Sequence, residues 1–261
     1  MSTTMNREQV EQYYTNLFTA EGRWAIPYPN IDEASRWAKI SEYLSELADL
    51  RRAAGARAPL RMLDVGCGRG WLTHLASSYG ECEGVEPVPA PVEQARTYFP
   101  ALNFRVGTTS DVLAAPEFRP YDVVLSSEVI EHVTDKETFV AEIARCLRPG
   151  GEVLLTTPRG EEYDKYLRVS PRETMQPVEE WISEEDLRAL FVRHGFRAVK
   201  HDRAYVHLPG MSALHTFCAR FDASRKLDRL RLKWLVRGLQ YAAAIYQVWW
   251  FRLEDREGRA R

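Results

Sequence analysis

Residues 63–70 of the chain read Leu63-Asp64-Val65-Gly66-Cys67-Gly68-Arg69-Gly70. An apolar run ends at Val65, glycines follow at alternate positions, and a helical pattern begins at about Trp71. Glycine adopts backbone dihedrals that a β-carbon forbids, and it lets the backbone approach a ligand closely. The stretch therefore predicts a strand, a tight turn that faces a ligand, and then a helix.

Short apolar runs alternate with helical patterns through the middle of the chain. The predicted strands are Arg61–Val65, Cys82–Glu86, Asn103–Val106, Tyr121–Ser126 and Glu152–Thr157, with predicted helices at 70–79, 90–98 and 135–147. Such alternation favours a parallel-rich sheet with helices on both faces. We therefore expect an α/β fold of the Rossmann-like type, with a helical segment added at each end.

The chain divides into three expected regions. Residues 1–57 are predicted to form an N-terminal helical extension or flap, in which Asn30 and Glu33 make a capping box. Residues 58–207 are the predicted Rossmann-like core. Residues 208–261 are predicted to form basic amphipathic C-terminal helices.

The later part of the chain gives further local expectations. Residues 158–182 are polar and irregular, which predicts a surface loop or lid. A helix is expected from Ser183 to about His194, followed by two strands at 197–201 and 204–207. The last helix is predicted at about 224–253.

Charge is unevenly distributed along a chain of otherwise ordinary globular composition. The 261 residues are 45% hydrophobic and 28% charged, and the net charge of −2 gives no general sign of nucleic-acid binding. Residues 223–261 nevertheless carry a local balance of +6, which leaves −8 on the rest. A basic tail on an acidic body predicts contact with an anion, a membrane or another subunit. We therefore expect a homodimer or a peripheral membrane contact through the C-terminal helix.

The cysteines and the N-terminus predict a cytoplasmic protein. No two cysteines are spaced as a metal-binding or redox pair, and the first twelve residues are polar. The cysteines are Cys67, Cys82, Cys146 and Cys218.

The acid that closes the second predicted strand points to the cofactor. Glu86 follows the glycine turn at about the twenty-residue spacing at which an acid accepts the hydroxyls of a ribose. A pyrophosphate would favour the spacing G-x-G-x-x-G, whereas this turn reads G-x-G-x-G after Asp64. A carboxylate there repels a pyrophosphate and suits a cation. S-adenosylmethionine, which has an ammonium, a sulfonium and no phosphate, is therefore the favoured cofactor.

Several ordered segments resemble the class I S-adenosylmethionine-dependent methyltransferases. Leu63–Gly70 resembles the first motif of that family, Glu86 matches its ribose acid, Asp122–Ser127 resembles its fourth strand, and Leu147–Gly151 resembles the turn before its fifth. The resemblance covers about residues 60–200. It implies a set of cofactor contacts, comprising Asp64, Gly66, Gly68, Gly70, Glu86 and Ser127, with Ser110 or Asp111 at the adenine amine. Asp111 alternatively caps a helix.

The segment Glu128-Val129-Ile130-Glu131-His132 follows the fourth predicted strand. If it is helical, Glu128, Glu131 and His132 share one face and suit Mg²⁺ or Mn²⁺. Such a metal would lower the pKa of a bound hydroxyl and orient it toward the methyl group. Two other interpretations remain open: His132 or Glu131 acts as a general base without metal, or the pair packs against the cofactor pocket.

The E-x-x-E-H pattern resembles two branches of the family. One branch contains ubiquinone-pathway O-methyltransferases and relatives that act on small hydroxylated molecules. The other contains small-RNA 3′-end 2′-O-methyltransferases, which use a further histidine that would fall near Gln176–Glu180. This chain has no histidine there.

The leading prediction is an O-methyltransferase for a small metabolite, with a sugar or glycoside ahead of a phenolic or polyketide compound. Tyr13, Tyr14 and Trp24 are expected to form a flap over the acceptor. This hypothesis needs no nucleic-acid partner. The alternatives are an RNA ribose 2′-O-methyltransferase and an inactive cofactor-binding partner protein.

Overall fold

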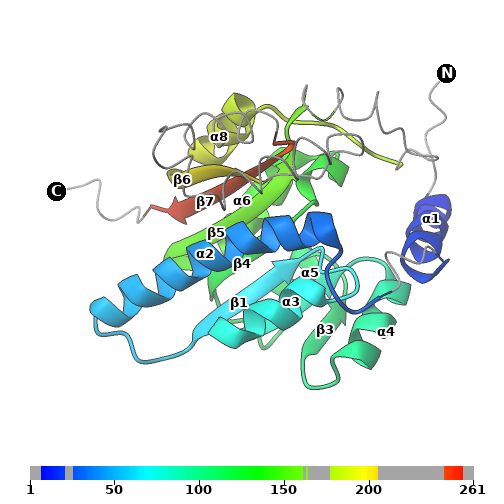
Figure 1. Ribbon diagram of the computed structural model, residues 1–261, viewed down its shortest axis with the longest axis horizontal. Coiled ribbons are helices and arrows are strands. Elements are labelled where there is room, and N and C mark those ends of the chain that lie inside the picture. Colours follow the sequence, from blue (N-terminus) through cyan, green and yellow to red (C-terminus); the bar gives the residue numbers. More distant parts are fainter. Residues whose placement is uncertain (1–6, 21–25, 161–162, 164–176, 205–243, 255–261) are drawn as a thin grey trace, which may run out of the picture.

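The computed structural model describes residues 7–20, 26–160, 163, 177–204 and 244–254 (Figure 1). Its helices are α1 (Arg7–Ala20), α2 (Ile31–Ala53), α3 (Trp71–Ala76), α4 (Pro89–Tyr98), α5 (Thr109–Ala114), α6 (Lys136–Cys146) and α8 (Glu184–Arg193), with 3-10 turns η1 (Ser77–Tyr79) and η2 (Ile130–His132). Its strands are β1 (Leu60–Val65), β2 (Gly80–Glu86), β3 (Asn103–Val106), β4 (Tyr121–Ser127), β5 (Leu147–Pro158), β6 (Phe196–Ala204) and β7 (Tyr246–Leu253).

The strands form one seven-stranded sheet in the order β3-β2-β1-β4-β5-β7-β6. Strands β1 to β5 are parallel, and β7 runs antiparallel to both of its neighbours. The strand order reverses direction between β1 and β4, which is the switch point at which ligands bind in open α/β sheets. The predicted Rossmann-like α/β fold is confirmed, and β5 begins earlier than predicted because Leu147 already pairs with Tyr121.

The predicted helix at 224–253 is wrong over its last eight residues, since Tyr246–Leu253 is a strand. Val248 and Trp250 pack on one face of the sheet, whereas Trp249 and Phe251 pack on the other. Both faces of β7 are buried, so its sequence has the unbroken apolar run Val248–Phe251 and lacks the alternation that marks a half-exposed strand. These residues therefore belong to the sheet rather than to a C-terminal helical segment.

The strand predicted at 197–201 is confirmed as part of β6, Phe196–Ala204, which also contains the first residue of the strand predicted at 204–207. Residues 205–207 lie outside the described residues, as do the other parts of the predicted C-terminal helices, 208–243 and 255–261. Most of the predicted lid, residues 164–176, also lies outside the described residues.

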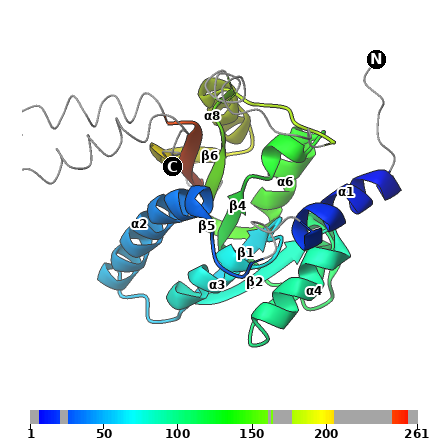
Figure 2. The same ribbon diagram turned by 45° about the vertical axis from the view of Figure 1, so that its right-hand side comes forward.

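Helices cover both faces of the sheet (Figures 1 and 2). Ile40 and Leu44 of α2 share a buried cluster with α3 and one face of the sheet. Val140 and Ile143 of α6 join α8 and the opposite face. The predicted capping box at the start of α2 is confirmed, because Asn30 accepts from the backbone of Glu33 and the Glu33 side chain accepts from the backbone of Asn30. No helix among the described residues is both long and apolar enough to cross a membrane.

A core substitution in β7 tests its place in the sheet. Trp250 is fully buried and its indole N–H donates to Glu152 over 2.6 Å. We expect Trp250→Ala to lower the free energy of unfolding by about 3–5 kcal/mol in urea denaturation, because it leaves a cavity and removes the hydrogen bond to Oε2 of the buried Glu152, which keeps only its bonds to Arg252. Val192→Ala, at a side chain that is 50% exposed, should change it by less than about 0.5 kcal/mol. If both variants lost equally little free energy of unfolding, β7 would lie outside the core.

Candidate cofactor and acceptor site

The glycine turn lies at the carboxyl end of β1 and is tied to β2. The backbone N–H groups of Gly66 and Cys67 both donate to the carbonyl of Val85, over 2.8 and 3.1 Å. Gly66 has a φ of 70°, and a β-carbon there would lie 2.4 Å from a methyl carbon of Val129. The predicted strand, turn and helix are all present, with α3 beginning at Trp71.

Glu86 closes β2 and reaches back to the glycine turn. One carboxylate oxygen accepts from the N–H of Gly68 over 3.2 Å, and the other accepts from the N–H of Val88 over 3.1 Å. Burial raises the pKa of Glu86 to about 7, although these two hydrogen bonds lower it. The predicted ribose acid therefore lies directly beside the predicted turn, held by the backbone.

Asp64 lies beneath the turn and is 1% exposed. Its carboxylate accepts from the hydroxyl of Thr73 over 2.7 Å, which joins β1 to α3. Burial raises the pKa of Asp64 to about 7, against the lowering effect of the hydrogen bonds from Thr73. This carboxyl group joins the strand to the helix that follows the turn, and its contact with a cofactor stays a prediction.

The residues predicted at the adenine amine make helix contacts in this structure. The carboxylate of Asp111 accepts from the backbone and the hydroxyl of Thr108, over 2.8 and 2.9 Å, and so completes a capping box for α5. The hydroxyl of Ser110 donates to Glu142 of α6. Asp111 therefore takes part in capping α5 as its third residue, while Thr108 is the N-cap, and a contact of Ser110 or Asp111 with adenine stays a prediction.

The segment after β4 is a sharp turn rather than an α-helix. Glu128 has a φ of 60° and is the one non-glycine residue with positive φ among the described residues. Only Ile130–His132 is helical, as a single 3-10 turn. The prediction that Glu128, Glu131 and His132 share a helix face is therefore wrong, because the left-handed residue Glu128 breaks the helical path.

Glu128 and Ser127 point toward β5 and α2. The hydroxyl of Thr156 donates to Glu128 over 3.1 Å and lies 2.9 Å from the hydroxyl of Ser127. The nearest cation to Glu128 is Arg36, whose Nε lies 3.9 Å from its Oε1. Burial raises the pKa of Glu128 to about 8, and Arg36 opposes that rise.

Glu131 and His132 form a close pair. Nε2 of His132 lies 3.8 Å from Oε1 of Glu131, which also accepts from the hydroxyl of Thr157 over 2.9 Å through Oε2. Nδ1 of His132 lies 2.6 Å from the carbonyl oxygen of Val178. Because a carbonyl only accepts, Nδ1 carries the proton, and in the neutral ring Nε2 is the basic nitrogen. Burial raises the pKa of Glu131 to about 7.

The predicted metal ligands are not assembled as a set. Within the part of the chain that the structure describes, no group of three or more His, Cys, Asp or Glu side chains is arranged to hold a metal ion. Glu128 is directed to Arg36 and Thr156, whereas Glu131 is directed to Thr157 and His132. Binding of Mg²⁺ or Mn²⁺ here stays a prediction.

Helix α1 covers the site with aromatic side chains. The ring of Tyr14 lies 6.3 Å from the ring of His132 and 5.3 Å from that of Tyr13. Two ring carbons of Phe18 would lie 3.1 Å from a β-carbon at Gly68. One helix therefore contacts both the glycine turn and the turn after β4, as the predicted flap requires. Trp24 lies outside the described residues.

Tyr14 connects the two halves of the site electrostatically. Burial and the charges of Tyr13, Glu86 and Glu131 raise the pKa of Tyr14 well above its ordinary value, so the phenol stays neutral.

The sequence interpretation did not include Phe18 in the predicted flap. Its signal was the spacing of four residues from Tyr14, which places both rings on one face of a helix.

A buried ion pair fastens the glycine turn to α2. Arg69 is 1% exposed, and its two terminal nitrogens donate to Glu33 over 2.9 and 2.6 Å. Its Nε donates to the carbonyl of Ile26 over 2.6 Å, and Nη2 donates to that of Tyr28 over 3.3 Å. The turn that was predicted to hold the cofactor is thus also the anchor of the N-terminal extension.

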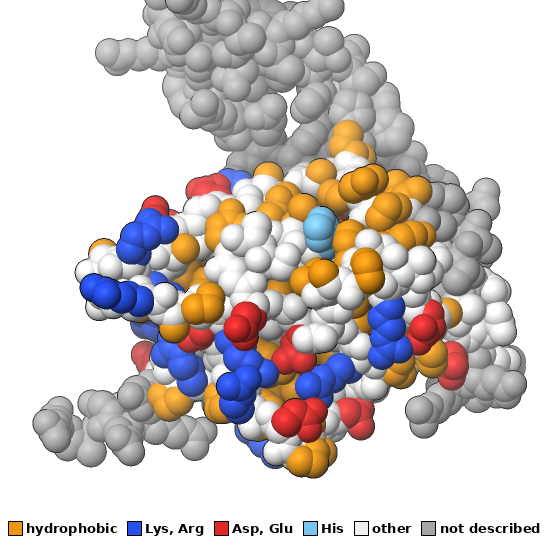
Figure 3. Space-filling view, turned by 90° about the horizontal axis from the view of Figure 1, so that it is seen from below, with side chains coloured by type: hydrophobic (Ala, Val, Ile, Leu, Met, Phe, Trp, Pro, Cys, Tyr) orange, Lys and Arg blue, Asp and Glu red, His pale blue; other side chains and the backbone are white. Residues whose placement is uncertain are grey.

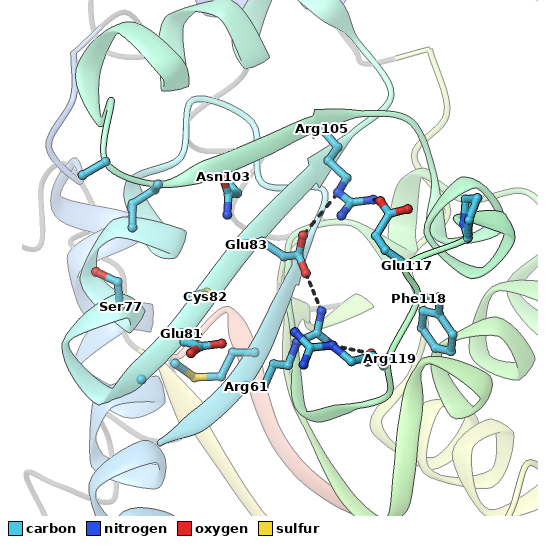
Figure 4. A pocket seen from close by; sticks show the side chains of 15 residues that line it. Arg61, Ser77, Glu81, Cys82, Glu83, Asn103, Arg105, Glu117, Phe118 and Arg119 are labelled. Atoms are coloured by element: carbon cyan, nitrogen blue, oxygen red, sulfur yellow. Dashed lines mark hydrogen bonds and ion pairs between the residues drawn. The ribbon is translucent and has the colours of Figure 1, made fainter. Parts of the chain in front are cut away.

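A separate hollow lies at the amino ends of β1, β2 and β3 (Figure 4). It encloses about 940 Å³ and is crossed by ion pairs from Glu83 to Arg61 and Arg105. It is on the sheet edge opposite Glu86, so it is not the predicted site.

Figure 3 shows a face of the molecule on which basic and acidic side chains are interspersed, without an extended surface of one sign. That face gives no support to the RNA hypothesis.

A mostly parallel sheet that reverses between β1 and β4, with a glycine turn after β1 and an acid closing β2, defines a Rossmann-like domain. A family model described as a methyltransferase domain matches residues 36–201, more than half of the chain. The chain therefore belongs to this family of methyltransferase domains.

Two curated relatives are about one-third identical in sequence. Norajmaline N-methyltransferase from Rauvolfia serpentina is 35% identical over 146 residues, which cover 52% of this chain and 45% of that protein. Ubiquinone biosynthesis O-methyltransferase from Caulobacter sp. (strain K31) is 34% identical over 118 residues, which cover 42% of this chain and 47% of that protein. The chain thus matches less than half the length of each relative.

Solved structures share the fold over nearly the whole chain. Magnesium protoporphyrin IX methyltransferase from Synechocystis PCC 6803, with bound SAH, has a TM-score of 0.58 at 14% identity and covers 95% of this chain and 99% of its own. The [4+2]-cyclase SpnF has a TM-score of 0.58 at 18% identity and covers 97% of both chains. Since one of these proteins is a methyltransferase and the other a [4+2]-cyclase, the fold alone does not define the chemistry.

Removing the charge of Glu86 tests the cofactor half of the site. We expect Glu86→Gln to weaken binding of S-adenosylhomocysteine by about 10- to 100-fold in calorimetric titration, because a charge-assisted hydrogen bond to the ribose is lost. Glu81→Gln is the matched control, since Glu81 is exposed on the same strand. Equal affinities for both variants and the wild type would remove Glu86 from the binding site.

The raised pKa values of Asp64 and Glu86 predict that the stability of the ligand-free protein depends on pH. Asp64 and Glu86 have ordinary pKa values of 3.8 and 4.5, and burial raises both to about 7. Between these values the folded protein holds more protons than the unfolded chain, so the free energy of unfolding falls as pH rises from about 4.5 to about 7. Urea denaturation of ligand-free protein at pH 5.5 and 7.5 should show this fall, and Glu86→Gln should make it smaller. If the free energy of unfolding of the wild type and of Glu86→Gln depended on pH in the same way, the raised pKa of Glu86 would be contradicted.

Proposed function

We propose that this protein is an S-adenosylmethionine-dependent methyltransferase that acts on a hydroxyl group of a small molecule. The observation that carries the proposal is the placement of the Glu131–His132 pair next to the glycine turn and Glu86, with Tyr14 of α1 over both. Membership of the methyltransferase domain family supports it.

The residues around the glycine turn suit this cofactor. Glu86 would accept from the ribose hydroxyls. Gly66 and Gly68 have no side chain, which leaves room for Val129 and Phe18 to pack against the turn. Buried carboxyl groups at Asp64 and Glu86 favour a ligand with positive charge. When bound, the cofactor supplies a methyl group on a sulfonium, which is transferred by direct displacement.

His132 is the proposed general base. An alcohol holds its proton far above neutral pH, so a neighbouring base must remove it as the new bond forms. The Val178 carbonyl fixes the tautomer in which Nε2 accepts this proton, and the Glu131 carboxylate at 3.8 Å stabilises the imidazolium that results. The remaining rate enhancement comes from holding the acceptor hydroxyl in line with the methyl group.

The contacts of α1 with both turns favour a small acceptor over a polymer. Tyr14 and Phe18 of α1 cover the region between the glycine turn and His132. Aromatic rings stack on sugars and on phenols, which keeps a sugar or glycoside first and a phenolic or polyketide compound second. The mechanism needs no metal at His132, because Nδ1 already donates to Val178 and Nε2 faces Glu131.

Amine acceptors are the second candidate. The 35% identity to norajmaline N-methyltransferase favours this class. The same histidine would take the proton of an ammonium group, so the site chemistry is shared, and acceptor screening must contain amines alongside hydroxylated compounds.

Replacing His132 tests the proposal. After an acceptor has been found by screening sugars, phenols and amines for release of S-adenosylhomocysteine, His132→Gln should lower kcat by about 100-fold or more while leaving cofactor affinity within about threefold. His194→Gln is the matched control, because His194 pairs with Glu137 on the outer helices. An unchanged kcat in His132→Gln would overturn the base assignment. Loss of activity in EDTA, restored by Mg²⁺, would instead support the metal-assisted version.

A further inference from the structure

Two consecutive threonines near the end of β5 each donate a hydroxyl group to a different acid of the turn after β4. The hydroxyl of Thr156 donates to Glu128 over 3.1 Å, and the hydroxyl of Thr157 donates to Oε2 of Glu131 over 2.9 Å. Successive side chains of a strand point to opposite faces of the sheet, so the two hydroxyls approach the turn from opposite sides. The end of β5 therefore holds the two carboxyl groups apart.

The hydroxyl group of Thr157 lies in an otherwise apolar environment. Thr157 is fully buried, and the earlier residues Val153, Leu154 and Leu155 of the same strand are buried and apolar. Valine has nearly the same shape as threonine and suits a strand, and it would bury no hydroxyl group, which costs free energy unless it is bonded. The bond to Glu131 is therefore what the hydroxyl group contributes at this position.

The direction of the Glu131 carboxylate depends on this bond. Among the residues that the structure describes, Thr157 is the one side chain that donates a hydrogen bond to it. The main chain is held separately, because the carbonyl of Glu131 accepts from the backbone N–H of Glu180 over 2.9 Å. The other carboxylate oxygen, Oε1, faces Nε2 of His132 at 3.8 Å. With Oε2 bonded to Thr157, the carboxylate is restrained from rotating away from His132.

The distance between Glu131 and His132 becomes important once the imidazole takes a proton. A hydrogen bond between an imidazolium and a carboxylate measures about 2.7–2.9 Å. Starting from 3.8 Å, Oε1 has to move by about 1 Å to form this bond. A carboxylate that is anchored through its other oxygen can make this small movement, whereas an unanchored carboxylate turns in several directions. Thr157 thus keeps a negative charge within reach of the base.

We infer that Thr157 is a positioning residue of the proposed methyltransferase, because its hydroxyl group holds the Glu131 carboxylate toward the base His132. This inference rests on the proposed function and adds to it a residue that acts only through Glu131. The neighbouring Thr156 bonds to Glu128, so it has no such part in the base. Misplacing a catalytic group by about 1 Å costs up to about 100-fold in rate, which sets the scale of the expected effect.

Removing and restoring the hydroxyl group tests the inference on the intact protein. At saturating S-adenosylmethionine, and with the acceptor found by screening, Thr157→Val should lower kcat by about tenfold and leave KM for the acceptor within about threefold. Thr157→Ser keeps the hydroxyl group, so it should retain kcat to within about threefold of the wild type.

Thr109→Val is the matched control. Thr109 is also buried, at 3% exposure, and its hydroxyl also donates to a glutamate, Glu142, which lies in α6. We expect this variant to keep its kcat, even if its Tm falls. If kcat of Thr157→Val equalled that of Thr109→Val, Thr157 would have only a structural part and the inference would be overturned.

The ring of His132 reports the same contact without an acceptor. In protein labelled with ¹⁵N-histidine and saturated with S-adenosylhomocysteine, the Nε2 signal of His132 is identified by its absence from His132→Gln. We expect this signal to move in Thr157→Val, because the charge beside Nε2 is displaced, and to return to its wild-type position in Thr157→Ser. A signal that stays in place in Thr157→Val would overturn the inference.

The same set of variants separates this inference from the proposed function. If the wild type fails to bind S-adenosylhomocysteine, or if His132→Gln keeps its kcat, the proposed function fails and the inference fails with it. If His132→Gln loses activity while Thr157→Val retains both the wild-type kcat and the wild-type His132 signal, only the inference is removed.

Discussion

The buried pair between Arg69 and Glu33 joins two parts of the chain that are 36 residues apart in sequence. Arg69 stands inside the glycine turn, and Glu33 stands in the first turn of α2. Because both groups are buried, breaking either partner would strand a charge in the interior. The pair therefore holds α2 over the carboxyl edge of the sheet, and that placement brings Arg36 to the far side of β4.

This arrangement divides the edge of the sheet into two neighbouring halves. The half over β1 and β2 has the glycine turn and Glu86, with backbone N–H groups as the donors to that carboxylate. The half over β4, β5 and β7 has Glu131, His132 and Arg36. The buried acids Asp64 and Glu86 of the first half suit a cationic cofactor, whereas the second half combines buried acids with the buried cation Arg36. Tyr14 lies over the junction of the two.

The backbone at Glu128 forms that junction. Its φ of 60° costs a non-glycine residue free energy, and such strain is maintained only where the surroundings fix the conformation. Here the backbone N–H of Glu128 donates to the carbonyl of Thr156 over 3.0 Å, while its side chain accepts from the same residue. The turn directs Glu131 and His132 into the site from a segment that has only one turn of helix. No pattern of local propensity predicts a left-handed glutamate, so the sequence left open whether this segment is helical.

The parallel strands, the glycine turn and the place of Glu86 could all be predicted from neighbouring residues, because strand periodicity, glycine dihedrals and the spacing of an acid are local properties. The tertiary structure decided what depends on partners far away in the chain. Tyr246–Leu253 is a strand because β5 and β6 offer free edges on both sides, whereas its own apolar run is equally compatible with a helix. The bonding of Arg69, the contact of Arg36 with Glu128 and the tautomer of His132 likewise depend on side chains brought together only by folding, since desolvation and hydrogen bonding act through space and leave no period in a sequence.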